Sequence, residues 1–326
     1  MKSTRDLQDK IQSIDLESLP ISEYNKKYIR RIRPTLAHYV SIYRFCLTEG
    51  MKNYNKPLSE ITLVDYGGGS GFLSMFLKQQ GVGRVVYVDF NPDSVFTAQR
   101  LKEEVGLGAD VFLCGDSATL LSWCRDNQTQ PDMLISTDVI EHIYCLDSFF
   151  ADLHRINNRM RLVFTTGSNP YNPMKKRALR QIMVEDESGT KYGESFYSQR
   201  LRFIQNEFPI LSEEEAYYWA ENTRGLVFED VRKAVEMNQP KPLQDKYNTC
   251  DPKTGSWTER ILPIADYKRL AESYNYHLKV KNGFFYPYNG GMIKKILSLS
   301  GNVFLKAAGR LGLPVAPFIL LKYVTN

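Results

Sequence analysis

This sequence of 326 residues has little of several features that mark particular classes of protein. Its formal net charge is only +5, and no dense run of lysine and arginine alternates with aromatic residues, so nucleic-acid binding is not indicated. No stretch reaches the roughly 18 consecutive apolar residues that a membrane-spanning helix needs, and the N-terminus lacks the apolar core of a signal peptide. We therefore expect no transmembrane segment and no nucleic-acid partner.

Metal-binding and disulfide patterns are missing as well. The five cysteines show no C-x-x-C spacing, and no cluster of acids or histidines has the spacing of metal ligands, so we predict no metal site. An odd number of thiols in mostly apolar surroundings is typical of the cytoplasm, where we expect this protein. What is present, 43% hydrophobic and 24% charged residues, is the composition of a soluble globular protein.

The most informative segment is residues 61–71, Ile-Thr-Leu-Val-Asp-Tyr-Gly-Gly-Gly-Ser-Gly. A run of β-forming residues ends in Asp65, four glycines follow, and apolar residues then recur at helical spacing. This order predicts a strand, a tight turn and a helix start, where bare backbone amides can bind a carboxylate or a phosphate. The dinucleotide pattern G-x-G-x-x-G fits poorly, because Phe72 or Ser74 stands where the third glycine belongs.

Further strands with polar ends follow this turn. Residues 85–89 form an apolar run that ends in Asp89, about twenty residues after the glycines, where a carboxylate can bind both hydroxyls of a ribose. The remaining strands are predicted at residues 110–114, 131–137 and 161–165. Since these strands alternate with helical patterns, we expect a parallel sheet with a ligand crevice at the carboxyl ends of its strands.

Two motifs resemble those of a known family. The pattern Asp65-x-Gly67-x-Gly69-x-Gly71 resembles motif I of the class I S-adenosylmethionine-dependent methyltransferases, and residues 138–142, Asp-Val-Ile-Glu-His, resemble the post-strand motif of small-molecule members such as those of quinone biosynthesis. The resemblance covers roughly residues 55–166 and concerns cofactor and fold rather than substrate. It implies an α/β, Rossmann-like fold with a mostly parallel seven-stranded sheet, helices on both faces and S-adenosyl-L-methionine as cofactor.

The resemblance also implies roles for single residues. Asp65 is expected near the methionine end of the cofactor, Asp89 at the ribose, Phe90 against the adenine and Asp116 at the adenine amino group. For Asp116 or Asp138 taken alone, a role as a helix N-cap explains the acid about as well as a role in cofactor binding or catalysis. The expected cofactor-binding residues are Asp65, Gly67, Gly68, Gly69, Gly71, Asp89, Phe90, Asp116, Ser117, Ser136 and Thr137.

A general base is expected among the four histidines. His142 is the one at the predicted crevice, and an imidazole takes up protons near neutral pH. If a helix begins at Asp138, this carboxylate shares a face with His142 and can orient the imidazole, so we predict both as catalytic residues. The alternative is that His142 only caps or packs a helix start.

Four regions are expected along the chain. They are leader helices at residues 1–55, a cofactor-binding core at 56–169, a helical insertion at 170–258 and the end of the core, with an antiparallel strand pair, at 259–326. Helical patterns at 171–184, 195–208 and 212–236 fill the insertion, which we interpret as a lid over the acceptor or, alternatively, as a dimerisation element. Residues 217–219 and 248–252 are its candidates for substrate contact, against a packing role for the aromatics and local capping in the turn.

The tail combines apolar and basic residues in a helical pattern before a final strand at 316–322. Packing of this helix beside the sheet is the main expectation, and a weak contact with a membrane surface is the alternative.

The expected function is methyl transfer to an oxygen of a small-molecule or glycan-like acceptor. Methylation at nitrogen or carbon, a nicotinamide-dependent reductase, and a non-catalytic cofactor-binding subunit are the alternatives.

Overall fold

The computed structural model describes residues 2–189, 193–286 and 291–325. Its strands are β1 (Thr62–Tyr66), β2 (Arg84–Asp89), β3 (Val111–Cys114), β4 (Met133–Thr137), β5 (Arg161–Thr166), β6 (His277–Asn282) and β7 (Ile319–Val324). Its α-helices are α1 (Arg5–Ser13), α2 (Glu23–Ile32), α3 (Leu36–Met51), α4 (Phe72–Gln80), α5 (Pro92–Val105), α6 (Ser117–Asp126), α7 (Leu146–Ile156), α8 (Pro173–Ser188), α9 (Phe196–Glu207), α10 (Glu213–Asn222), α11 (Phe228–Glu236), α12 (Ile264–Ser273) and α13 (Met292–Ala308).

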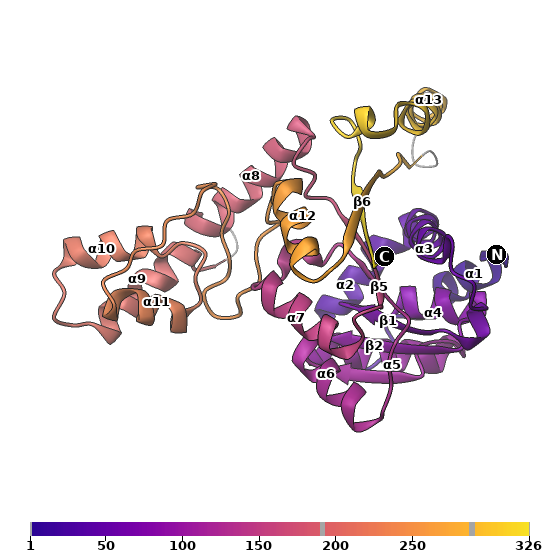
Figure 1. Cartoon of the computed structure of the whole chain (residues 1–326), viewed down its shortest axis with the longest axis horizontal. Coiled ribbons are helices and arrows are strands. Elements are labelled where there is room, and N and C mark those ends of the chain that lie inside the picture. The colour runs from indigo at the N-terminus through magenta and orange to yellow at the C-terminus, as the bar shows by residue number, and fades with distance from the viewer. Residues whose placement is uncertain (1, 190–192, 287–290, 326) are drawn as a thin grey trace.

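The described strands form one seven-stranded sheet in the order β3-β2-β1-β4-β5-β7-β6 (Figure 1). Strands β1 to β5 run parallel, and β7 is antiparallel to both of its neighbours. This confirms the α/β fold class, including the antiparallel pair that the sequence expected after the insertion. Because β6 is antiparallel to β7, it runs in the same direction as β5, and its carboxyl end lies at the same edge of the sheet as those of β1 to β5.

Alternate residues of the strands pack into two cores, one on each face of the sheet. Leu63 and Tyr87 lie with α1 to α5 on one face, whereas Val64 and Val86 lie with α6, α7 and α12 on the other. Strands covered on both faces must be apolar on both sides, which is why their sequences are continuous hydrophobic runs.

The leader helices lie on the first of these faces. Helix α2 ends at Ile32, and a 3-10 turn, Arg33–Thr35, separates it from α3. Pro34 lies inside this turn. Because proline lacks the N–H that an uninterrupted helix needs, it separates the two helices.

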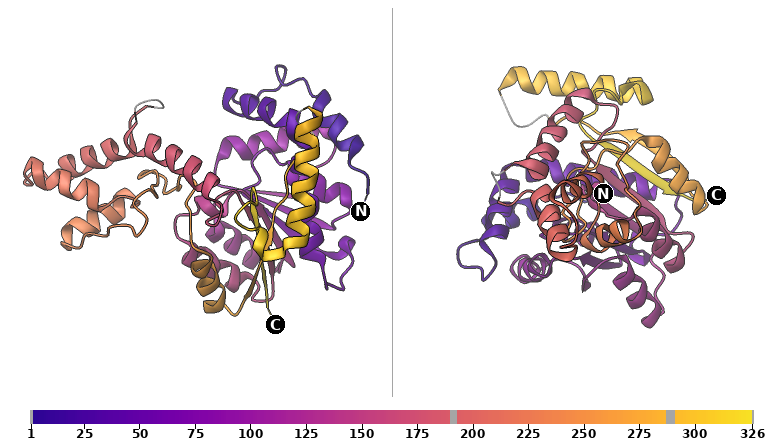
Figure 2. Two further views of the ribbon diagram at one scale, coloured as in Figure 1. Left: turned by 90° about the horizontal axis from the view of Figure 1, so that it is seen from above. Right: turned by 90° about the vertical axis from the view of Figure 1, so that its left-hand side faces the viewer.

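The insertion after β5 reaches outward from the sheet (Figures 1 and 2). Helix α8 extends away from the sheet, and α9, α10 and α11 pack on one another at its far end around a small core that includes Trp219 and Ile204. The predicted helix at 212–236 is wrong as one unit, because α10 ends at Asn222 and α11 starts at Phe228. Gly225, with φ of +81° and against the ring of Trp257, makes the turn between them.

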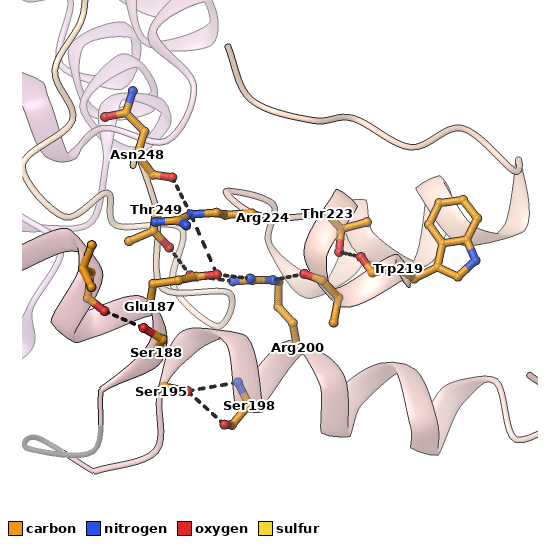
Figure 3. A network of polar contacts seen from close by, with 12 residues as sticks. Glu187, Ser188, Ser195, Ser198, Arg200, Trp219, Thr223, Arg224, Asn248 and Thr249 are labelled. Carbon is orange, nitrogen blue, oxygen red and sulfur yellow. Dashed lines mark hydrogen bonds and ion pairs between the residues drawn. The ribbon is translucent and has the colours of Figure 1, made fainter. Parts of the chain in front are cut away.

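A buried ion pair ties this outer lobe together (Figure 3). Arg200 is fully buried, and its guanidinium meets the Glu187 carboxylate at 2.5 Å and 3.2 Å and donates to the carbonyl of Ala220 at 3.1 Å. Thr249 donates a further hydrogen bond of 2.6 Å to Glu187. The polar turn at 248–252 and Trp219 therefore have structural partners inside the lobe.

Candidate active site

The glycine turn after β1 is held by β2. The amides of Gly67 and Gly68 donate to the carbonyl of Val88 at 2.8 Å and 3.3 Å, and Gly69 donates to the Asp89 carboxylate at 2.9 Å. Gly67, Gly69 and Gly71 all have positive φ, and a Cβ on Gly68 would stand 2.4 Å from the ring of Tyr87. A Cβ on Gly69 would meet nothing within 4 Å, so this part of the turn is open toward a ligand.

Asp65 lies at the base of this turn and is 1% exposed. Its carboxylate accepts a hydrogen bond of 2.6 Å from Ser74, the residue that replaces the third glycine of a dinucleotide site. Burial is the main reason that the pKa of Asp65 is raised to about 7; hydrogen bonds from Ser74 oppose this rise, and the negative charge of Asp89 adds a smaller part to it.

The residues after β2 and β3 form a second group, on the other side of the glycine turn. Asp89 is almost buried and accepts hydrogen bonds of 2.9 Å from the amides of Gly69 and Asn91, while burial raises its pKa. Phe90 beside it is 68% exposed. Asp116 caps α6 by accepting from the amides of Ala118 and Thr119.

Two predicted cofactor-binding serines, Ser117 and Ser136, are buried within the protein. The Ser117 hydroxyl donates to Asp152 at 2.7 Å, and Ser136 is 1% exposed, within β4. Neither side chain lines the cavity described below.

The segment after β4 does not begin a helix at Asp138. This residue has φ of +54°, and only a 3-10 turn, Ile140–His142, follows. The imidazole Nδ1 of His142 lies 2.7 Å from the carbonyl oxygen of Trp257. A carbonyl can only accept, so Nδ1 carries the proton and Nε2 of the neutral ring keeps its lone pair. The partner that orients the ring is thus Trp257, not Asp138 as the sequence suggested.

Two glutamates complete this end of the site. Glu141 is 1% exposed; its Oε1 accepts 2.7 Å from Thr166, and its Oε2 has no hydrogen-bond partner among the described residues. Glu259, with φ of +49°, accepts from the Ser168 hydroxyl at 3.0 Å through its carbonyl and at 3.2 Å through its carboxylate.

Glu141, Glu259 and His142 are close enough to share an ion. One side-chain ligand atom from each lies within 4.8 Å of the others, a spacing at which a metal ion can be held. Sequence spacing could not reveal this group, because Glu259 comes from the loop after the insertion. The predicted absence of a metal therefore stays a prediction.

A cavity of about 440 Å³ lies between the glycine turn, the end of β4, the leader helices and the start of α8. Its volume suits a small molecule. It is lined by Tyr28, Arg31, Ile32, Tyr39, Tyr43, Asp65, Gly67, Gly68, Gly69, Ser70, Phe72, Leu73, Thr137, Asp138, Val139, Glu141, His142, Gly167, Lys175, Leu179 and Glu259.

Carboxylates dominate the charge at one end of the cavity. Asp138 borders open space, yet enough protein surrounds it to raise its pKa to about 6, an effect that Glu259 increases and that His142 and Lys175 oppose. Burial also raises the pKa of Glu141 well above its usual range, with Asp138 adding to the rise. This end is thus suited to take up a proton or to receive a positive charge.

Sequence reasoning found one part of this cavity and missed another. Of the predicted residues, Asp65, Gly67, Gly68, Gly69, Thr137, Asp138 and His142 line it, whereas Gly71, Asp89, Phe90, Asp116, Ser117 and Ser136 do not. The residues missed include Arg31, Lys175 and Glu259. Residues 217–219 and 248–252 do not line the cavity, so they are not placed for substrate contact there.

The residues present fit a nucleoside-linked amino acid. The open space beside Gly69, the buried Ser70 hydroxyl, which has no hydrogen-bond partner in the described chain, and Asp65 suit an amino-acid end. Asp89 and exposed Phe90 lie beyond the turn, where a carboxylate and an aromatic face suit a ribose and a purine.

Comparisons with known proteins agree with this fit. Residues 64–159 match the family described as "Methyltransferase domain". No curated protein sequence matches the chain.

Several solved structures are similar in outline. The plantazolicin methyltransferase BpumL in complex with SAH is 14% identical, with 98% of this chain and 96% of that chain covered and a TM-score of 0.44. The plantazolicin methyltransferase BamL, in complex with a triazolic desmethylPZN analog and SAH, is 16% identical, with 98% and 95% covered and a TM-score of 0.43. A methyltransferase bound to the Trm112 activator of Haloferax volcanii is 11% identical, with 87% and 91% covered and a TM-score of 0.42. Scores this low carry no information on the acceptor of this chain.

The family match and the order of the sheet decide between the cofactors that the glycine turn alone allowed. Residues 64–159 span β1 to the loop before β5, the half of the sheet that carries the turn and the acids at the strand ends. Residues 64–159 therefore form a methyltransferase domain of the class I type, whose cofactor is S-adenosylmethionine.

Proposed function

We propose that this enzyme methylates an oxygen atom of a small-molecule or glycan-like acceptor bound in the cavity. When bound, the cofactor supplies a methyl group that is already activated on a sulfonium sulfur. The protein then has to hold the acceptor in line, exclude water and remove the hydroxyl proton. The observation that carries the proposal is the hydrogen bond from His142 Nδ1 to the Trp257 carbonyl, which leaves Nε2 free to accept that proton.

Several residues of the cavity have supporting roles in this proposal. Glu141 and Glu259 lie beside the imidazole, and the carboxylates of Glu259 and Asp138 stabilise the positive charge that it gains. Tyr28, Tyr39 and Tyr43 line the cavity as well. Aromatic faces combined with carboxylate acceptors suit a polar ligand with several hydroxyls, which supports the glycan-like class.

The binding side of the proposal rests on both groups of residues. Asp65 and the space beside the glycine turn receive the amino-acid end of the cofactor, and Asp89 binds its ribose. Phe90 packs on the adenine, and Asp116 receives the adenine amino group through the side of its carboxylate that is not engaged in capping. We retain the four regions with the boundaries expected from the sequence, and we assign the closing role of the insertion to the start of α8, which lines the cavity.

Methylation at nitrogen is the second candidate. It is favoured by the carboxylates at the cavity end, since Asp138 and Glu259 together would attract an ammonium group. An ammonium group must lose a proton before its nitrogen has a lone pair for attack, so the same imidazole would serve.

The test is untargeted mass spectrometry of metabolite extracts incubated with the enzyme and cofactor. We expect one acceptor whose mass increases by one methylene group. This mass increase should become larger when the methyl group of the cofactor carries deuterium. Fragmentation then locates the new methyl group on oxygen or on nitrogen. A product methylated on carbon, or retention of full activity when both His142 and the carboxylates are replaced, would refute the proposed proton transfer.

A further inference from the structure

Helix α13 stands out as an apolar element that the protein does not bury. It connects β6 to β7 and lies apart from the helices that cover the sheet (Figures 1 and 2). All of its residues are described, and Leu305 is the only one that is buried. Seven large apolar side chains are between 48% and 80% exposed: Met292, Ile293, Ile296, Leu297, Leu299, Val303 and Phe304.

These side chains share one half of the helix. At about 100° per residue they fall within an arc of roughly 160°, and the residues opposite them face the protein. On that opposite side Asn302 accepts from the amide of Phe285 at 2.6 Å and donates to its carbonyl at 2.9 Å, while Asn282 donates to the carbonyl of Leu305 at 3.1 Å. The protein is therefore tied to the polar side of α13, and the apolar half is turned outward.

Positive charges border this outward half. On the same helical projection, Lys294 falls at one margin of the apolar arc, and Lys295 and Lys306 fall at the other. Arg310 follows in the next turn. From residue 273 to residue 326 the sequence contains seven lysines and arginines and no aspartate or glutamate. An apolar face flanked only by cations matches the surface of a bilayer with anionic headgroups.

We propose that α13 docks, in the plane of the interface, on an anionic lipid bilayer. Within the described residues no helix is long and apolar enough to cross a bilayer, so the helix lies on the surface instead of spanning. A second copy of this chain is a poorer partner, because pairing two such faces would bring the lysine margins of both copies together. The sequence had favoured packing of this helix beside the sheet, and the outward apolar half overturns that expectation.

The position of α13 gives the docking a direction. The helix follows β6, whose carboxyl end lies at the same edge of the sheet as the glycine turn and the cavity. Docking would therefore hold the cavity-bearing edge near the lipid surface. Binding to the bilayer does not depend on the proposed function, so it can be tested without an acceptor.

The test is co-sedimentation of the full chain with two kinds of vesicle, phosphatidylcholine alone and phosphatidylcholine mixed with phosphatidylglycerol. We expect binding to the mixed vesicles, little binding to the neutral ones, and weakening as salt rises. Ile296→Glu combined with Val303→Glu should reduce the partition coefficient by about tenfold or more. Lys294→Gln and Lys295→Gln should each reduce it by about fivefold.

Ile210→Glu is the matched control, because Ile210 is 93% exposed but lies in the far lobe, between α9 and α10. It should bind vesicles like the unchanged protein. Phe304→Trp should show an indole emission that shifts to the blue on adding mixed vesicles. Equal binding to neutral and anionic vesicles, or no effect of the double substitution, would overturn the proposal. The proposal would also be overturned if light scattering showed a dimer of the unchanged protein, the double substitution dissociated this dimer, and neither protein bound vesicles.

Discussion

The imidazole of His142 is anchored by the backbone of a residue 115 positions later: its Nδ1 lies 2.7 Å from the carbonyl oxygen of Trp257. The amide of Trp257 in turn donates to the carbonyl of His142 at 3.1 Å, so the end of the insertion is bonded to the post-β4 turn in both directions. This pairing brings Glu259 to the cavity and fixes the tautomer of the ring.

Replacing His142 should affect the rate more than binding. For His142→Ala we expect cofactor affinity close to that of the unchanged protein and a rate loss on the order of 10²–10⁴, the range for a lost general base. Steady-state kinetics with the identified acceptor, and calorimetry with S-adenosylhomocysteine, measure the two effects. His277→Ala, an exposed histidine at the start of β6, is the control. An unchanged rate would mean that His142 only packs the turn.

Replacing Asp89 should affect cofactor binding. Asp89→Ala leaves the amide of Gly69 without its partner and removes the proposed ribose ligand, so the binding free energy should weaken by about 1–3 kcal/mol. Calorimetric titration with S-adenosylhomocysteine gives this number. Asp110→Ala is a matched control, since Asp110 also bonds a strand amide, that of Val85 at 2.7 Å, but just before β3, at the opposite edge of the sheet. Equal losses in both variants would remove Asp89 from the ribose.

The buried acid Asp65 should make stability depend on pH. Its folded-state pKa of about 7 lies above the ordinary value of 3.8, so the folded form holds the proton that the unfolded form releases. Its contribution is thus fully present below about pH 4 and is lost as pH rises through about 7.

Asp65→Asn abolishes this titration. The stability of the variant relative to the unchanged protein should therefore rise by about 2 kcal/mol between roughly pH 5 and pH 8. Urea unfolding at the two pH values measures the difference, and Asp9→Asn, an exposed acid on α1, should show no such trend. A constant difference at both pH values would contradict the raised pKa.

The buried Arg200–Glu187 pair should hold the outer lobe together. Arg200→Ala leaves a buried carboxylate uncompensated and should cost the lobe about 3–5 kcal/mol. Hydrogen exchange in α9 to α11 should accelerate, while the sheet and binding of S-adenosylhomocysteine remain unchanged. Arg202→Ala on the same helix, whose partner Glu194 is at the surface, should cost no more than about 1 kcal/mol. Loss of cofactor binding in Arg200→Ala would show that lobe and core are coupled.

Removing metal ions should leave the enzyme active. If His142 acts as a base, a chelator has no effect, whereas added Zn²⁺ should inhibit, because an ion shared by Glu141, Glu259 and His142 occupies the imidazole. Activity assays after chelation and gel filtration, with and without added ions, decide this. Loss of activity on chelation that a divalent ion restores would assign these residues to a metal instead.

The sequence by itself determined the sheet core, the glycine turn and the cofactor class. These depend on local signals: β-forming runs of near-continuous apolar residues, four glycines in a turn, and acids that follow strands at set intervals. Asp65 and Asp89 could be located because parallel strands bring their carboxyl ends to one edge, whatever the rest of the chain does.

Only the tertiary structure decided which residues surround the cavity at its acceptor end and which apolar residues stay outside. Glu259 reaches Glu141 across more than a hundred residues, and Trp257 replaces Asp138 as the partner of His142, because both depend on where the insertion returns to the core. The same holds for α13, whose alternating apolar and basic residues are compatible with packing or with exposure. Which face turns inward was set by the hydrogen bonds of Asn302 and Asn282, long-range contacts that a local pattern does not encode.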